Sequence, residues 1–179
     1  MAFFEVLPED RVPAEAKEWI EVAKKRQRVD RLAPELYAMA GHPKLLKAFV
    51  QSQEDLIPVP NRFGVVEFVA SMLIAHAKKC GPCFNASRGF LLKIGFDDAT
   101  LDNMCRAPAT LPLSERERHF VEFTLRVATD PAGVKPDDLR EMERRGFSKD
   151  EILEMIGVAG FWSLATTVTS ALDVGLREG

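Results

Sequence analysis

The sequence predicts an all-α protein, and three observations support that class. Apolar residues recur at helical spacing, as in Leu32, Leu36 and Met39 at i, i+4 and i+7. Prolines precede several of these stretches, as they do in the first turns of helices. Alternating strand patterns of useful length are absent. The valine-rich stretch 65–69 continues into the alanine-containing stretch 70–77, so we expect a helix there as well.

Capping residues mark where two later helices are expected to begin. Ser114 with Glu117, and Ser148 with Glu151, fit the Ser-x-x-Glu capping box. In that box each side chain accepts a hydrogen bond from the other residue's backbone N–H. These signals predict helices that start just after each serine.

A faint internal repeat divides the chain. Gly95-Phe96 and Gly146-Phe147 each separate two helical stretches, and we expect each glycine to cap the helix before it. Apolar residues follow both pairs at matching positions. We therefore predict a single domain over residues 1–179, with an N-terminal helical extension over about 1–30 and two related halves over about 30–105 and 112–175, joined by the proline-containing stretch 106–112.

Composition and charge exclude several classes of protein. The chain has 179 residues, 46% hydrophobic and 28% charged, which is ordinary for a globular protein. The net charge of -3 comes from interspersed charges of both signs, so no basic face for nucleic acid is expected. The first residues lack the basic start of a signal peptide, and there are only three cysteines, so we expect a cytoplasmic location. The uncharged stretch 155–172 is diluted by Gly, Ser and Thr, so we expect a buried helix and no membrane span.

The segment Cys80-Gly81-Pro82-Cys83 carries the clearest chemical signal. Two cysteines three positions apart can close a disulfide or share a metal, and proline is tolerated in a first helical turn, so a helix should begin near Cys80. A thiol at that place faces unpaired N–H groups and the positive end of the helix dipole, which favour the reactive thiolate. The alternatives are two structural cysteines or a zinc half-site. No second ligand pair has metal spacing, so we expect no metal and no cofactor.

Two other residues are candidates for proton transfer near the dithiol. Glu67 stands among apolar residues, where burial would raise its pKa and make it a usable base; the alternative is a place on an exposed stripe. His76 would share one face with Cys80, Cys83 and Ser87 if a single helix ran through all four. If a new helix starts at Cys80, that alignment is lost and His76 has a packing role.

From residue 40 to about 174 the sequence resembles the AhpD-like, carboxymuconolactone decarboxylase family of alkylhydroperoxidases. The resemblance implies an all-α AhpD-like fold of two related helical halves, assembled as a homo-trimer or homo-hexamer. Its motifs are His42-Pro43, a glutamate-bearing helix, the Cys-x-x-Cys at 80 and 83, Gly95-Phe96-Asp97-Asp98, the stretch 113–117 and the stretch 146–153.

The resemblance also implies roles for particular residues. Cys83 would attack a peroxide, Cys80 would resolve the product, and Glu67 would accept a proton. The helix-terminus argument instead favours Cys80 as the thiol of lower pKa, and we prefer the assignment implied by the family. The chain departs from the peroxidase pattern at Ser87 and Pro82, where the pattern has histidines, and Glu67 precedes Cys80 by one residue more than in the pattern. Proton delivery would then fall to His76, to water or to nothing.

We therefore predict a thiol-dependent alkylhydroperoxidase-type antioxidant protein. Its expected partners are a hydroperoxide substrate and a dithiol reductant or adaptor protein, with no nucleic acid and no membrane. Three alternatives stay open: a dithiol-disulfide exchanger, a non-redox lyase like the carboxymuconolactone decarboxylases, and a non-catalytic homo-oligomeric binding protein. Cys105 has no partner by sequence and is expected to be a structural or incidental thiol.

Overall fold

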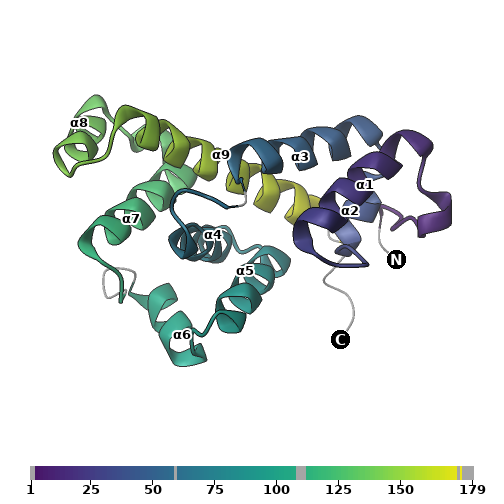
Figure 1. Ribbon diagram of the computed structural model, residues 1–179, viewed down its shortest axis with the longest axis horizontal. Helices are drawn as coiled ribbons and strands as arrows, with labels where there is room; N and C mark the ends of the chain where they lie inside the picture. Colours follow the sequence, from purple (N-terminus) through teal and green to yellow (C-terminus); the bar gives the residue numbers. More distant parts are fainter. Residues whose placement is uncertain (1–2, 59, 108–111, 173, 175–179) are drawn as a thin grey trace. The chain divides into compact units, whose positions relative to one another are not determined.

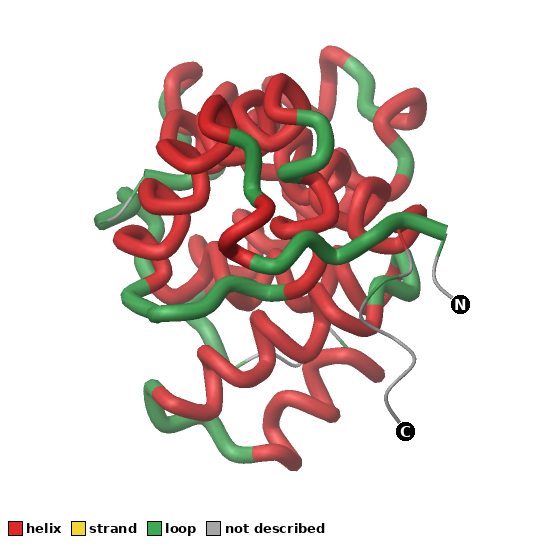
Figure 2. The backbone as a smooth tube through the Cα atoms, turned by 90° about the vertical axis from the view of Figure 1, so that its right-hand side faces the viewer, coloured by secondary structure: helices red, strands yellow, loops and turns green. Residues whose placement is uncertain are grey.

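The computed structural model has the all-helical architecture that the sequence predicts (Figure 1). It describes residues 3–58, 60–107, 112–172 and 174. Over these residues the backbone forms helices and loops without a strand, as Figure 2 shows. The elements are η1 (Glu9–Arg11), α1 (Ala14–Gln27), α2 (Pro34–Met39), α3 (Pro43–Leu56), α4 (Val65–Ala77), α5 (Gly81–Lys93), α6 (Asp98–Arg106), α7 (Glu115–Thr129), η3 (Pro131–Gly133), α8 (Pro136–Arg144) and α9 (Lys149–Leu172).

Backbone contacts group the chain into two compact units. One comprises residues 1–59 and 167–179, and the other comprises residues 60–166. The predicted joint at 106–112 therefore falls within the second unit, and its residues 108–111 lie outside the described part of the chain. The organisation as a single domain with two related halves stays a prediction.

In the first unit, α1 and α2 both pack against α3. Tyr37 of α2 is buried, and its hydroxyl donates to Glu9 of η1 at 2.6 Å. The Lys24 ammonium of α1 lies 2.9 Å from the same carboxylate oxygen. Glu9 therefore links η1 to both α1 and α2.

In the second unit, α4 is central and packs against α5, α6 and α7 (Figure 1). Its apolar length explains this place, because a helix that is apolar on all sides is stable only when neighbours cover every face. The core around it is formed by buried residues of these four helices and of α8 and α9: Val66, Val69, Ala70, Met72, Leu73, Leu91, Leu101, Met104, Phe120, Val121, Phe123, Met142, Ile152 and Met155, with Phe147 from the α8–α9 turn.

Both predicted capping boxes are present. The Ser114 hydroxyl accepts the Glu117 N–H at 3.3 Å, while Glu117 accepts the Ser114 N–H at 2.8 Å. Ser148 and Glu151 make the same reciprocal pair, at 3.1 and 2.8 Å. Each box satisfies backbone donors that a helix start leaves unpaired, which explains why α7 and α9 begin where they do.

The two Gly-Phe pairs end helices in the same way. Gly95 and Gly146 have φ of +107° and +86°, a conformation that favours glycine. After α5, the Gly95 N–H donates to the Leu92 carbonyl and the Phe96 N–H to the Leu91 carbonyl, both at 3.1 Å. Gly146 and the following phenylalanine repeat this pattern after α8. The predicted role of both glycines as C-caps is confirmed.

α9 is, over the described residues, the helix long and apolar enough to cross a membrane by length and composition. Its most apolar window has a mean hydropathy of 1.4, and 44% of that window is buried. Met155, Val158 and Ala159 are almost fully buried. The core helix of a water-soluble protein has these same properties, so the apolar length is weak evidence for a membrane span.

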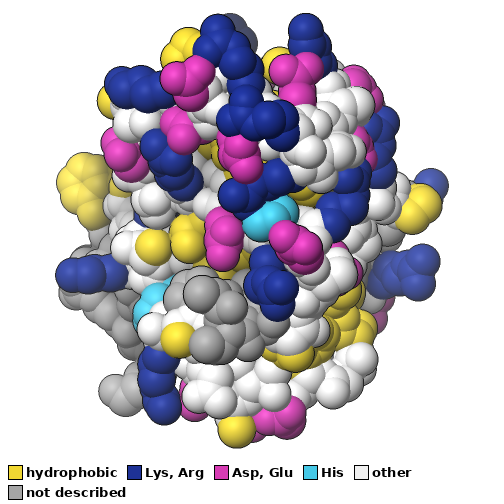
Figure 3. Space-filling view, turned by 90° about the vertical axis from the view of Figure 1, so that its left-hand side faces the viewer, with side chains coloured by type: hydrophobic (Ala, Val, Ile, Leu, Met, Phe, Trp, Pro, Cys, Tyr) yellow, Lys and Arg dark blue, Asp and Glu magenta, His cyan; other side chains and the backbone are white. Residues whose placement is uncertain are grey.

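The face drawn in Figure 3 carries Lys and Arg side chains interspersed with Asp and Glu. Ion pairs join neighbouring elements, for example Arg126 of α7 with Asp138 of α8 at 2.8 Å. A nucleic-acid site would need a concentrated basic area instead. The expectation that no nucleic acid binds stays a prediction.

Candidate active site

Glu67 lies in the first turn of α4 and is 2% exposed. Of its apolar neighbours on the helix, Val66 and Val69 are buried and Val65 and Phe68 are partly buried. The predicted placement of Glu67 on a largely buried helix is confirmed. The alternative of an exposed stripe is wrong for this residue. Ser71 lies one turn further along α4 and is also buried, so the two polar side chains share a face of an otherwise apolar helix.

A tight turn at Lys78 and Lys79 separates α4 from α5. Lys79 has φ of +57°, which is uncommon for a residue other than glycine. Its N–H donates to the His76 carbonyl at 3.1 Å, and the Cys80 N–H donates to the Ala75 carbonyl at 2.9 Å. This is the same capping pattern as at the two glycines. It stops α4 and redirects the chain immediately before the first cysteine.

A new helix then begins at the dithiol, as the sequence predicts. Cys80 is the N-cap of α5, Gly81 and Pro82 occupy the first two positions, and Cys83 the third. The Phe84 N–H donates to the Cys80 carbonyl at 2.9 Å and so makes the first bond of the helix. Pro82 is accommodated because the N–H that it lacks has no partner within a first turn.

Cys80 and Cys83 form a disulfide, with their Cα atoms 5.4 Å apart. Cys80 is 1% exposed and Cys83 is 8% exposed. Ala75 and the ring of Phe84 complete an apolar cluster around the two sulfurs. The pair lies at the N-terminus of a helix in largely dry surroundings, where the positive end of the dipole favours thiolate and burial opposes it.

His76 does not join the dithiol row. The turn at Lys79 breaks the helix, so the alignment that a continuous helix would give is absent. His76 is exposed, with its ring centroid 5.7 Å from that of Phe84. The structure thus agrees with the alternative in which His76 has a packing role.

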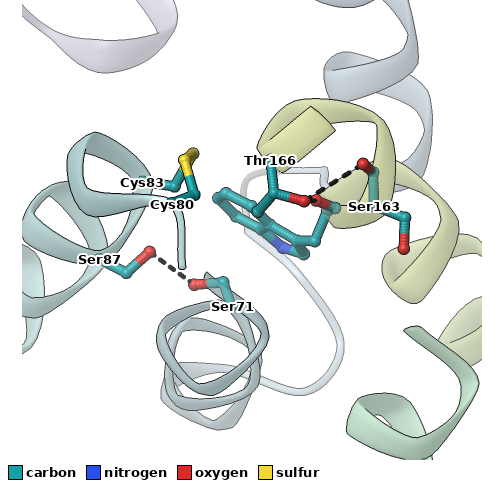
Figure 4. The surroundings of a disulfide bond; sticks show 7 residues. Ser71, Cys80, Cys83, Ser87, Ser163 and Thr166 are labelled. Atoms are coloured by element: carbon teal, nitrogen blue, oxygen red, sulfur yellow. Dashed lines mark hydrogen bonds between the residues drawn. A yellow bond between two sulfur atoms is a disulfide. The ribbon is translucent and has the colours of Figure 1, made fainter. Parts of the chain in front are cut away.

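Ser87 does join the site. It follows Cys83 by one helical turn on α5 and is 4% exposed. Its hydroxyl lies 2.8 Å from the hydroxyl of Ser71, which comes from α4 (Figure 4). Sequence reasoning missed Ser71, although one signal was present: it is a polar residue one turn after Glu67 in an apolar helix. Its contact with Ser87 depends on the packing of two helices and has no signature in the sequence.

α9 contributes a wall with polar side chains to the same region. Figure 4 shows Ser163 and Thr166 on α9, across from the disulfide. The Thr166 hydroxyl donates to the Trp162 carbonyl at 2.7 Å. The indole of Trp162 packs against the cluster of Ile74, Ala128 and Ala159, and its N–H has no hydrogen-bond partner among the described residues. The wall therefore combines polar side chains with a large aromatic ring, whose N–H is buried.

Cys105 and the zinc alternative lie apart from the dithiol chemistry. Cys105 is a free, partly exposed thiol, and its partial burial raises its pKa, the opposite of an activated thiol. Over the described residues, no three His, Cys, Asp or Glu side chains gather where they could hold a metal ion. The expectation that the protein binds no metal stays a prediction.

Comparisons with solved structures give the fold. A peroxidase-related protein from a Silicibacter species superposes with a TM-score of 0.78 at 19% identity, over 95% of this chain and 88% of that one. The core of an alkylhydroperoxidase AhpD, a peroxidase-related protein from Ralstonia eutropha, gives 0.80 at 16% identity, over 99% and 92%. The chain has the AhpD-like fold.

Another protein of similar structure has a different chemistry. The debrominase Bmp8, in a cysteine-to-alanine variant complexed with 2,3,4-tribromopyrrole, superposes with a TM-score of 0.77 at 14% identity, over 97% of this chain and 90% of that one. No family model and no curated protein matches the sequence. The similarity to solved structures therefore establishes the AhpD-like fold, and the function has to be argued from the site.

Proposed function

We propose that the protein is a dithiol peroxidase that reduces hydroperoxides and is recycled by an external dithiol. The observation that carries the proposal is the Cys80–Cys83 pair, which closes a disulfide at the start of α5, directly after the helix that carries the buried Glu67. A thiolate is the nucleophile in such chemistry, and a helix start favours it. The AhpD-like fold shared with peroxidase-related proteins supports the same assignment.

In the proposed reaction the Cys83 thiolate attacks the outer oxygen of a hydroperoxide. The O–O bond breaks, the sulfur becomes a sulfenic acid, and the leaving alkoxide takes a proton to become an alcohol. The Cys80 thiol then attacks the oxidised sulfur, which forms the disulfide and releases water. A dithiol carrier returns both cysteines to the reduced state and is itself oxidised to a disulfide.

Exposure supports Cys83 as the attacking residue. It is 8% exposed, against 1% for Cys80, so an incoming peroxide reaches its sulfur with less rearrangement. Cys80, as the N-cap, is placed to resolve the intermediate from the side of the helix start. Glu67 is the proposed proton acceptor for Cys83 on the resemblance to the family, and it is a buried carboxyl group on the helix that precedes the dithiol.

The test is a titration of free thiols with cumene hydroperoxide, read by intact mass. We expect the wild type to form the Cys80–Cys83 disulfide, Cys83→Ser to lose the reaction, and Cys80→Ser to stop at the sulfenic acid. Glu67→Gln should slow the reaction on the order of a hundredfold, as loss of a general base does. Cys105→Ser is the matched control and should react as the wild type does. A wild type that loses no thiols to peroxide would overturn the proposal.

A second candidate is the reductive removal of bromine from an aromatic ring. The observation that favours it is a neighbour of the same fold that debrominates and binds 2,3,4-tribromopyrrole. The aromatic surface of Trp162 lies in the same unit as the dithiol. In this reaction the dithiol would be oxidised to the disulfide while carbon–bromine is replaced by carbon–hydrogen and bromide leaves. Release of bromide from tribromopyrrole, with cumene hydroperoxide left unconsumed, would identify the protein as a debrominase rather than a peroxidase.

The remaining alternatives correspond to distinct outcomes of the same assays. Faster reduction of insulin disulfides than of peroxide would indicate a disulfide exchanger. Activity on a lactone acid that survives Cys83→Ser would indicate a lyase, and thiols inert in every assay would indicate a binding protein. We also propose a homo-trimer or homo-hexamer in the cytoplasm, on the resemblance to the family, and light scattering would measure the mass.

A further inference from the structure

A pair of buried hydroxyl groups lies beside the dithiol. The Oγ atoms of Ser71 and Ser87 are 2.8 Å apart, and the two residues are 0% and 4% exposed. Ser71 also lies 2.8 Å from the Phe68 carbonyl oxygen, one turn back on α4. Among the described residues, Ser71 is the one hydrogen-bond partner of the Ser87 side chain. A buried hydroxyl with a single partner has hydrogen-bonding capacity to spare.

The protons of this pair can be arranged in two ways. The Ser71 hydroxyl has one proton and two acceptors in reach, the Phe68 carbonyl and the Ser87 oxygen. When Ser71 donates to Phe68, Ser87 donates to Ser71. When Ser71 donates to Ser87 instead, the Ser87 proton is released for a third acceptor. The two arrangements differ only by rotation about two C–O bonds.

The candidate for that third acceptor is the sulfur of Cys83. Ser87 follows Cys83 by four residues on α5, so both side chains lie on one face of the helix. Figure 4 shows the disulfide and the serine pair on the same side of α5. A thiolate is a much stronger acceptor than a disulfide sulfur, because hydrogen bonds to charged groups are about twice as strong as neutral ones.

We propose that Ser87 donates a hydrogen bond to the Cys83 thiolate in the reduced protein, and that Ser71 supports it by turning its own proton from the Phe68 carbonyl to the Ser87 oxygen. In the disulfide state both protons turn back. No proton is gained or lost in this step. The inference rests on the proposed function in that it assigns the reactive thiolate to Cys83. Ser71 is a positioning residue, because it acts through Ser87.

The test has to keep constant the charged and titratable side chains on α4, on the turn after it, on α5 and on α6. Glu67 lies in the first turn of α4. His76 lies in the last turn of α4, and Lys78 and Lys79 form the turn that follows it. On α5, Arg88 makes ion pairs with Asp98 and Asp102 of α6. The set is Glu67, His76, Lys78, Lys79 and Arg88 with Asp98 and Asp102. The α9 side chains that Figure 4 shows across from the disulfide, Ser163 and Thr166, are uncharged. None of these residues changes in the serine variants.

The experiment measures the thiol pKa of Cys83 by the ultraviolet absorbance of its thiolate, in full-length protein carrying Cys80→Ser and Cys105→Ser. We expect Ser87→Ala to raise that pKa by about one unit, which means about tenfold less thiolate at a fixed pH below it. Ser87→Thr keeps a hydroxyl and should restore most of the thiolate. Ser87→Gly is a second variant without the hydroxyl, and circular dichroism verifies that each variant is folded.

Ser71→Ala separates the proposed role from a merely structural one. It leaves the Ser87 hydroxyl free to donate to sulfur, so the pKa should move less than in Ser87→Ala, although Ser71→Ala costs more stability. A thiol pKa unchanged in folded Ser87→Ala, or pKa shifts that follow the order of stability, would overturn the proposal. No peroxide is present in this experiment. A negative result therefore says nothing against the proposed peroxidase activity, and a negative peroxide titration says nothing against the hydrogen bond from Ser87 to the Cys83 thiolate.

Discussion

At the scale of single residues, Ser71 and Ser87 form a polar contact between two buried side chains of the second unit. Each hydroxyl is buried, so its hydrogen bond is needed to offset the loss of water. The two residues differ in what a deletion leaves behind. Ser71 retains the Phe68 carbonyl if Ser87 is removed, whereas Ser87 has no other hydrogen-bond partner among the described residues if Ser71 is removed.

This difference predicts an asymmetry in stability. Ser71→Ala leaves a buried hydroxyl unsatisfied and should lower the free energy of unfolding by about 1–3 kcal/mol, while Ser87→Ala should cost about 1 kcal/mol or less. The double variant should resemble Ser87→Ala, because it leaves no unsatisfied group. Urea unfolding of the disulfide form measures all three. Equal losses in the two single variants, or a double variant at the sum of both, would contradict this account.

At the scale of elements, η1 is fastened through one carboxylate. The hydrogen bonds from Lys24 and from the Tyr37 hydroxyl hold the pKa of Glu9 below its ordinary value of 4.5. A carboxyl group with a lowered pKa in the folded state contributes stability that is fully present above its ordinary pKa. That contribution is lost as the pH falls through the lowered value.

The pH dependence of Glu9→Gln tests this assignment. The variant should melt below the wild type at neutral pH, and the difference should shrink as the pH falls from about 4.5 toward 2. Glu18→Gln is the matched control, since Glu18 is an exposed carboxylate of α1 without an ion pair in the described structure. Its melting temperature should stay close to that of the wild type throughout. A Glu9→Gln difference that stays constant with pH would show that the carboxylate charge is not what fastens η1.

The elements also show what local sequence can predict. Ser114 and Gly95 act within a few residues of themselves, so the capping box and the glycine cap followed from the sequence alone. The start of α5 at Cys80 followed in the same way from Pro82. Lys79 did not, because nothing about a lysine predicts positive φ. The Ser71–Ser87 contact was equally hidden, because it joins residues 16 positions apart through the packing of two helices.

At the scale of the whole molecule, the fold is more widely shared than any one chemistry. Structures at 14–19% identity superpose over nearly all of this chain, and they include peroxidase-related proteins and a debrominase. A dithiol that serves either reaction has to alternate between two covalent states while the surrounding fold stays intact. The main core of the second unit is built from α4, α6, α7, α8 and α9 with Leu91 of α5, and does not include either bonded cysteine.

The protein should therefore stay folded when the disulfide is reduced. The bond closes a loop of only four residues, for which the chain-entropy model gives roughly 2 kcal/mol. In a chain of this length that amounts to a fall in melting temperature of about 4–8 °C on reduction, with the helical circular dichroism unchanged. The variant carrying both Cys80→Ser and Cys83→Ser should melt at the same temperature with and without reductant. Unfolding of the wild type by reductant at room temperature would make the disulfide a structural bond, which could not cycle as a redox centre in this fold.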